Sequence, residues 1–213
     1  MKILLDILKV ILINISFIGL TLAANSCPSI SPNDAEDSPV AQSQAIIDDI
    51  LCSFIEQNKN AESTFFTTLN IAKKKIIPYV DIEYSTELVL GDYWDQLQYK
   101  DRKIFERDLK NSLINEYIYI LANIVNWDQI NIIVDENYKQ EGNIATIKVT
   151  SSLKNEPAKK AVVTLMMIKK DRWRVYDLIY QSIGMIDIEK IGYDSKIKRH
   201  GMNEFIRIML EET

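Results

Sequence analysis

The sequence predicts an α+β fold in which a curved antiparallel sheet, covered by several helices, encloses an apolar cavity. Apolar residues recur with helical spacing up to about residue 124, and with strand-like alternation from residue 129 to residue 179. A last helical segment follows. Because the strands succeed one another without helices between them, the order is not that of a doubly wound parallel sheet.

Composition sets the next limits. The chain has 213 residues, of which 47% are hydrophobic and 26% charged, which suffices for one sizeable core. Its formal net charge is -5. This balance argues against a nucleic-acid partner, which needs a concentrated basic surface, and against general attraction to anionic membranes.

The first 24 residues are predicted to be a targeting segment. Residues 1–24 combine an early Lys2, a long apolar run and the small residues Ala23 and Ala24, as a secretory signal peptide does. We expect cleavage after Ala24 or, alternatively, after Ala23. An uncleaved anchor is the competing interpretation, but the run is shorter than the roughly 20 residues that span a bilayer. Residues 25–39 are rich in Ser, Pro, Asn and Asp and are predicted to be a disordered leader.

The two cysteines leave three interpretations open. In an exported protein Cys27 and Cys52 can form a disulfide. Cys52 can instead be a small buried side chain on a helix while Cys27 stays in the leader. Finally, Cys27 follows the apolar run closely enough to be the lipid-bearing cysteine of a lipoprotein.

The first half of the chain is predicted to be helical. The expected helices are Val40–Asn58 with Ser38 as its cap and Pro39 in its first turn, Glu62–Ile77, and the long amphipathic Gln98–Asn123. Lys73, Lys74 and Lys75 form a basic run near the end of the second helix. Positive charges there interact favourably with the helix dipole, so the run is either a solvated helix end or a docking patch for a partner.

Between these helices, Ile76–Tyr93 is the stretch around which the chain is organised. Pro78 lacks an amide hydrogen and disfavours helix before it, so a boundary is expected at Ile77. A second short helix should then stop at Gly91. The apolar residues between the two breaks exceed what an exposed turn needs, so they are covered or they line a space: Val80, Ile82, Tyr84, Leu88, Val89 and Leu90.

The second half predicts an antiparallel meander followed by a helix at Tyr193–Leu210. The expected strands are Gln129–Asp135, Ile144–Leu153, Ala161–Lys170 and Trp173–Ile179. The turns between them are expected at Glu141–Asn143, Asn155–Pro157 and Lys170–Arg172. In the second strand Ala145, Ile147 and Val149 share one face, whereas 161–168 is apolar on both faces and its inward face stays open.

Catalytic patterns are sparse. The single histidine, His200, stands beside Lys198 and Arg199 and is expected on the surface. We expect no zinc site, Gly-rich phosphate loop or nucleophile elbow. Asp177, in an apolar strand, must be hydrogen-bonded or have a raised pKa. It is either a general base in a cone-shaped pocket or a structural acid bonded to backbone amides or a tyrosine.

Two segments together resemble a known family. Ile76–Leu121 contains Pro78-Tyr79-Val80, then Leu88-Val89-Leu90-Gly91, then a helix that opens with Lys100–Phe105. Trp173–Ile186 contains a W-x-V-Y-D strand at Trp173–Asp177. In order and spacing this set resembles the MlaC family, the periplasmic phospholipid-binding proteins also called the toluene-tolerance auxiliary family. Residues 40–213 are therefore expected to form an MlaC-like lipid-binding domain.

The resemblance implies a periplasmic carrier with an NTF2-like sheet, and neither an enzyme nor a protein with a cofactor. Its cargo is a phospholipid whose head group stays largely exposed. The implied partners are an inner-membrane ABC transporter complex and an outer-membrane lipoprotein complex, between which a monomer would shuttle lipid to maintain outer-membrane lipid asymmetry.

By the same resemblance, a set of mostly apolar residues is expected to line the cavity. Exposing two ~16-carbon chains to water costs on the order of 20 kcal/mol, so a deep dry cavity is required. Met166, Met167 and Met185 would give it a compliant wall. The candidate lipid-binding residues are Tyr79, Val80, Leu88, Val89, Phe105, Leu109, Leu113, Tyr117, Val149, Leu165, Met167, Val175 and Ile183.

Two other functions are kept beside the carrier. One is an NTF2-like enzyme that uses Asp177, and the other is a lipidated docking protein anchored through Cys27.

Overall fold

The computed structural model describes residues 31–59, 65–122 and 126–211, and for 59, 116–120 and 122 it describes the backbone alone. The predicted signal peptide and Cys27 lie outside this part. The described piece of the predicted leader, 31–38, consists of turns and bends, and Asn33 and Asp37 contact Arg172 and Lys169. The division of the chain into signal peptide, leader and domain stays a prediction.

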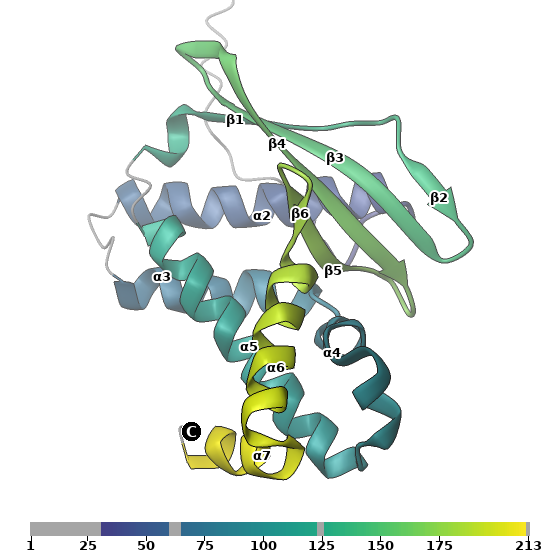
Figure 1. Cartoon of the computed structure of the whole chain (residues 1–213). Helices are drawn as coiled ribbons and strands as arrows, with labels where there is room; N and C mark the ends of the chain where they lie inside the picture. The colour runs from purple at the N-terminus through teal and green to yellow at the C-terminus, as the bar shows by residue number, and fades with distance from the viewer. Residues whose placement is uncertain (1–30, 60–64, 123–125, 212–213) are drawn as a thin grey trace, which may run out of the picture.

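The described chain combines helices and a curved, open antiparallel sheet, which confirms the predicted α+β class (Figure 1). The sheet lies across α2, and the other α-helices extend to one side of it. The helices are α2 (Pro39–Lys59), α3 (Phe65–Ile71), α4 (Ile82–Leu90), α5 (Tyr99–Ala122), α6 (Met185–His200) and α7 (Met202–Glu211). Shorter helical turns are η2 (Ala72–Ile76), η3 (Ile77–Tyr79), η4 (Gly91–Gln96) and η5 (Trp127–Gln129).

The sheet is the predicted meander with two additional short strands. Its order is β1-β3-β4-β5-β6, with β2 beside β3, and every pairing is antiparallel. The additional strands were not predicted because one is a polar three-residue piece and the other has two residues. The strands are β1 (Ile130–Val134), β2 (Lys139–Glu141), β3 (Ile144–Leu153), β4 (Glu156–Lys169), β5 (Trp173–Tyr180) and β6 (Ile183–Gly184).

The third predicted turn is confirmed, but the second was placed too late. The turn occupies residues 154–155, and β4 already begins at Glu156, so Pro157 lies inside a strand. The register between β3 and β4 shifts at Ser152 and Leu153. An irregularity of this kind is where a sheet tolerates proline, which cannot donate to the ladder.

Register decides which face of the sheet is covered. Ala145 pairs with Met167 and Ile147 with Leu165, so the predicted inward face of β3 continues onto β4. Ala145, Ile147 and Met167 are wholly buried, in a cluster that also packs against Ile47 of α2. The face of 161–168 that the sequence left open is thus the one that carries Leu165 and Met167.

Helix α2 confirms the first predicted helix and its cap. Ser38 Oγ accepts a hydrogen bond from the amide of Ala41 at 3.1 Å, and Pro39 begins the helix. Near its other end Phe54 stacks on Trp127 with ring centroids 4.2 Å apart. Cys52, also on α2, is disulfide-bonded, and the only other cysteine in the sequence is Cys27.

The last predicted helix was wrong in its start and its continuity. Helix α6 begins at Met185, eight residues before Tyr193, and it ends at His200. Gly201 has φ +77°, a conformation that side chains with a Cβ rarely adopt, so the chain turns there and starts α7. His200 is exposed at this break, as predicted.

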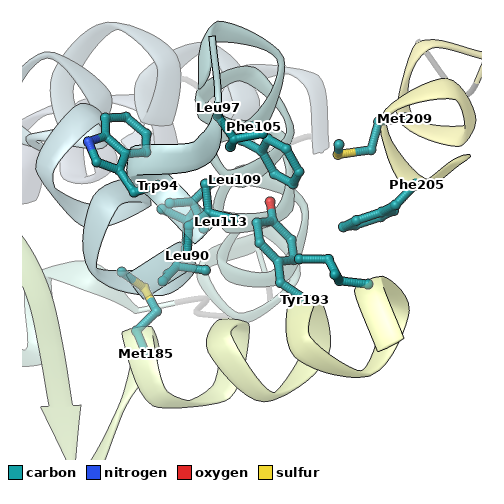
Figure 2. Close-up of a cluster of buried hydrophobic side chains, with 12 residues drawn as sticks. Leu90, Trp94, Leu97, Phe105, Leu109, Leu113, Met185, Tyr193, Phe205 and Met209 are labelled. Atoms are coloured by element: carbon teal, nitrogen blue, oxygen red, sulfur yellow. The ribbon is translucent and has the colours of Figure 1, made fainter. Parts of the chain in front are cut away.

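Helices α4, α5, α6 and α7 form a core of their own (Figure 2). Phe105 is fully buried, and its ring centroid lies 5.6 Å from that of Tyr193 and 5.7 Å from that of Phe205. Aromatic rings at such separations and at steep angles pack favourably. This helical core, as we call it, fixes the end of the molecule away from the sheet.

Candidate functional site

An apolar cavity of about 200 Å³ lies between the helices and strand β5. Its wall comes from η2, η3, the second half of α5, β5 and the first residue of α6. All ten lining residues are apolar: Ala72, Ile76, Ile77, Val80, Leu113, Ile114, Leu121, Val175, Leu178 and Met185. Such a space offers no polar partner to a bound molecule, so it suits hydrocarbon.

The wall from Ala72 to Tyr79 is irregular helix, which corrects the predicted continuous helix Glu62–Ile77. Its first residues lie outside the described part. Helix α3 ends at Ile71, and the next turns are π-helical from Ala72 to Ile76 and then 3₁₀-helical to Tyr79. Pro78 accounts for the change at the end, because it has no amide hydrogen to donate. A π-helical turn is rare and is often found at a functional site.

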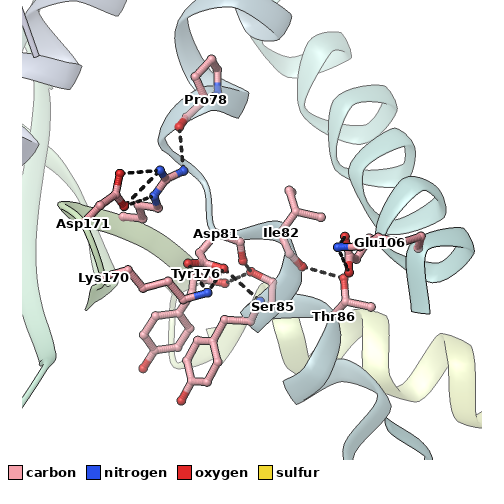
Figure 3. Close-up of polar contacts among 12 residues, drawn as sticks. Pro78, Asp81, Ile82, Ser85, Thr86, Glu106, Lys170, Asp171 and Tyr176 are labelled. Carbon is pink, nitrogen blue, oxygen red and sulfur yellow. Dashed lines mark hydrogen bonds and ion pairs between the residues drawn. The ribbon is translucent and has the colours of Figure 1, made fainter. Parts of the chain in front are cut away.

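The segment after this wall is tied to β5 by polar contacts (Figure 3). Buried Asp81 caps α4 by accepting from the amide of Tyr84 at 3.0 Å, and it pairs with Lys170 at 2.9 Å. Ser85 Oγ donates to the carbonyl of Tyr176 at 2.7 Å. These contacts hold α4 against β5, with Val80 beside Val175 at the edge of the cavity.

Asp177 follows Tyr176 on β5 and caps the start of helix α6. Its Oδ1 accepts from the amides of Leu178 at 2.8 Å and Ile186 at 3.1 Å, the second of which is in the first turn of α6. Burial raises the pKa of Asp177, while these amides act in the opposite direction. No described side chain donates to its carboxylate. The geometry therefore matches the structural interpretation of Asp177, in which backbone amides satisfy it.

Three of the candidate lining residues meet at the cavity: Val80, Leu113 and Val175. Of the others, Val89, Phe105 and Leu109 belong to the helical core, together with Leu113. Val149, Leu165 and Met167 belong to the core under the sheet. Tyr79 and Leu88 are half-buried, Ile183 is exposed, and the side chain of Tyr117 lies outside the described part. The set as a whole stays a prediction.

Several lining residues were not among the candidates. Ile76 and Ile77 end the predicted helix Glu62–Ile77, just before the run of apolar residues that the sequence singled out, so that signal stopped short of them. Ile114 and Leu121 lie on the same helix as Leu113 and were hidden by the long apolar stripe of α5. Met185, expected as part of a compliant wall, is in the lining.

Within the described ranges, no three His, Cys, Asp or Glu side chains come together as metal ligands would. In the same part of the chain, none of the helices combines the length and apolar character needed to span a bilayer.

The fold and the cavity define a class: α+β proteins in which helices and a curved antiparallel sheet enclose an apolar space. The family is settled by sequence. The family model described as MlaC protein matches residues 44–211, and the chain belongs to this family.

Two relatives agree with this placement. The chain is 23% identical over 185 residues to the intermembrane phospholipid transport system binding protein MlaC of Haemophilus influenzae, an alignment that covers 82% of each chain. It also has the fold of the phospholipid-binding protein of Ralstonia solanacearum, solved in complex with a phospholipid. That comparison gives a TM-score of 0.65 at 20% identity, over 82% of this chain and 96% of the other.

Proposed function

We propose that this protein is a periplasmic phospholipid carrier that shuttles lipid between inner- and outer-membrane complexes. The observation that carries the proposal is the wholly apolar cavity in a chain of the MlaC family. The two relatives support it, because one is named as a phospholipid transport binding protein and the other holds a phospholipid. Lining made only of hydrocarbon favours acyl chains over any polar ligand.

The size of the cavity says how loading must proceed. About 200 Å³ is below the roughly 300–1,000 Å³ of pockets that hold drug-sized ligands, and a two-chain lipid is larger than these. The wall must therefore move to admit cargo. The π-helical and 3₁₀ turns at residues 72–79 are the part suited to move. By contrast, α4 is held to β5 by Ser85 and to the turn before β5 by the pair of Asp81 and Lys170.

Export completes the proposal. A signal peptide at residues 1–24 and a leader at 25–39 would deliver the domain to the periplasm. Disulfides persist in oxidising compartments, and Cys52 is disulfide-bonded. The proposed partners are an inner-membrane ABC transporter complex and an outer-membrane lipoprotein complex, and the proposed wall includes Val80, Leu113 and Val175.

The test is native mass spectrometry of protein expressed with residues 1–24 and isolated from the periplasm, followed by denaturation and lipid analysis. The expected result is a mass excess that resolves into phospholipids. An apo mass, under conditions that keep lipid on a known lipid carrier, would contradict the proposal.

The same spectrum separates the interpretations of the cysteines. A chain that begins at Asn25 and is two hydrogens lighter than its reduced mass has a Cys27–Cys52 disulfide. A mass excess that denaturation leaves on Cys27 would instead show lipidation and support a docking protein.

A further inference from the structure

A second pocket, of about 370 Å³, lies next to the apolar cavity and is polar. Helices α3, α5, α6 and α7 and turn η2 contribute to it. Ile114 lines both spaces, and it forms a small buried cluster with Ala72, against which Leu69 packs. The polar pocket and the apolar cavity therefore adjoin, with Ile114 at their boundary.

Residues close together on the same elements line the two spaces. Ala72 lines the apolar cavity, and Lys73, the next residue, lines the polar pocket. On α5, Leu113 lines the cavity and Ser112 the pocket; on α6, Met185 lines the cavity and Glu189 the pocket. The two spaces together thus have the arrangement of an amphiphile, with an apolar part and a polar part that share one boundary.

The polar pocket carries three cations for which the described part of the chain offers no ion pair. Lys73, Arg107 and Lys196 line it, and none of them pairs with a described carboxylate. The Lys196 ammonium instead lies 5.4 Å from the ring centroid of Phe205. By contrast Lys75, in the same basic run as Lys73, pairs with Asp49 at 3.0 Å.

The two carboxylates of the pocket are engaged with hydroxyl donors. Tyr193 donates to Asp108 Oδ2 at 2.7 Å, and Ser112 donates to Glu189 Oε1 at 2.8 Å. Three cations against two carboxylates leave a positive excess of one. An anion with several oxygens can accept hydrogen bonds from ammonium and guanidinium groups together, and such charge-assisted bonds are strong.

We propose that this polar pocket binds the phosphate group of the carried phospholipid while the acyl chains occupy the adjoining apolar cavity. The inference rests on the proposed carrier function and deepens it, because it assigns the lipid phosphate to Lys73, Arg107 and Lys196. It also changes the expectation of a largely exposed head group: the phosphate would be held by the protein, and the group beyond it would face solvent.

The test compares a lipid that has a phosphate with one that lacks it. Protein is loaded from vesicles of equal parts phosphatidylethanolamine and diacylglycerol with the same acyl chains, and the bound lipids are quantified by mass spectrometry. We expect the wild type to take up phospholipid in excess. In Lys73→Gln/Arg107→Gln the ratio of bound phospholipid to diacylglycerol should fall about tenfold, because bonds to charged groups are lost.

The matched control removes the same charge outside the pocket. Lys74→Gln/Lys110→Gln changes an exposed lysine of η2 and a lysine of α5, neither of which lines the two spaces, and should keep the wild-type ratio. If the first double variant fails to fold, Lys196→Gln on the exposed end of α6 tests the same pocket from its other wall.

The outcomes separate this inference from the carrier proposal. A wild type that binds neither lipid contradicts the carrier proposal. A wild type that binds phospholipid with an unchanged ratio in the pocket variants contradicts only the phosphate site. Inorganic phosphate is titrated in parallel. If it binds the wild type but not the pocket variants while the lipid ratios agree, the pocket is a site for free anions and the inference is overturned.

Discussion

The helical core and the apolar cavity are both lined mostly by apolar side chains, and both take residues from α5 and α6. Side chains fill the core, whereas the cavity keeps an empty volume. Leu113 and Met185 belong to both. On one side of them Phe105, Tyr193 and Phe205 interlock (Figure 2). On the other side the lining is aliphatic and leaves about 200 Å³.

This difference comes from the backbone as much as from side-chain size. Most of the core comes from the α-helices α4 to α7, which present residues at a constant spacing and allow rings to interdigitate, and the 3₁₀ turn η4 adds Trp94. One wall of the cavity is formed by π-helical and 3₁₀ turns, which place Ile76 and Ile77 at a different spacing. An apolar stripe thus predicts burial but not whether the buried space is filled.

The largest expected effect is on stability and comes from the helical core. Phe105→Ala should lower the free energy of unfolding by about 3–5 kcal/mol, because the ring is wholly buried among other rings. Urea denaturation followed by circular dichroism measures this. Tyr99→Ala, on the same helix but 74% exposed, is the control and should change stability little. A loss as small as that of the control would mean that the helical core is not packed as described.

The next largest effect is expected at the apolar cavity and concerns lipid binding. Ile77→Trp places an indole in the cavity wall, so that cargo would overpack it by about 1–3 kcal/mol, which corresponds to about tenfold weaker lipid loading. Native mass spectrometry measures the loaded fraction, and the urea midpoint should stay near that of the wild type. Val162→Trp, at a position on β4 that is 45% exposed, is the matched control. Equal loading in the two variants would remove η3 from the proposed wall.

Some features of the fold and the site could be predicted from the sequence and others could not. The alternation of Ala145, Ile147 and Val149 predicted the buried face of β3 because a strand with one covered face must alternate. The expected stop of the short helix at Gly91 is confirmed, and beside Pro78 the chain changes from a π-helical to a 3₁₀ turn, since proline restricts the backbone locally. Such features depend on near neighbours in the chain.

The features that were missed depend on distant residues. Helix α6 starts at Met185 because Asp177, from the preceding strand, accepts the amide of Ile186. Lys73, Arg107 and Lys196 are far apart in the sequence, and only the packing of η2, α5 and α6 brings them to one pocket. Periodicity carries no information on either arrangement.

The smallest expected effect concerns the cap that joins the two sides, because Asp177 fixes the start of α6 and thereby Met185. Burial raises the pKa of Asp177 in the folded protein above its unfolded value. The folded state therefore holds more protons above about pH 4, and its stability falls as the pH rises through the folded pKa. The stabilisation that protonated Asp177 provides is fully present only below its unfolded pKa.

Asp177→Asn removes this dependence but can still accept both amides. Relative to the wild type, we expect its free energy of unfolding to rise as the pH increases above about 4 and to level off above the folded pKa of Asp177, as measured by urea denaturation at each pH. Asp92→Asn, at an exposed position, makes the same change of charge and should show no such slope. A difference between Asp177→Asn and the wild type that is constant with pH would show that the backbone amides fully offset the effect of burial, and that the pKa of Asp177 is not raised on folding.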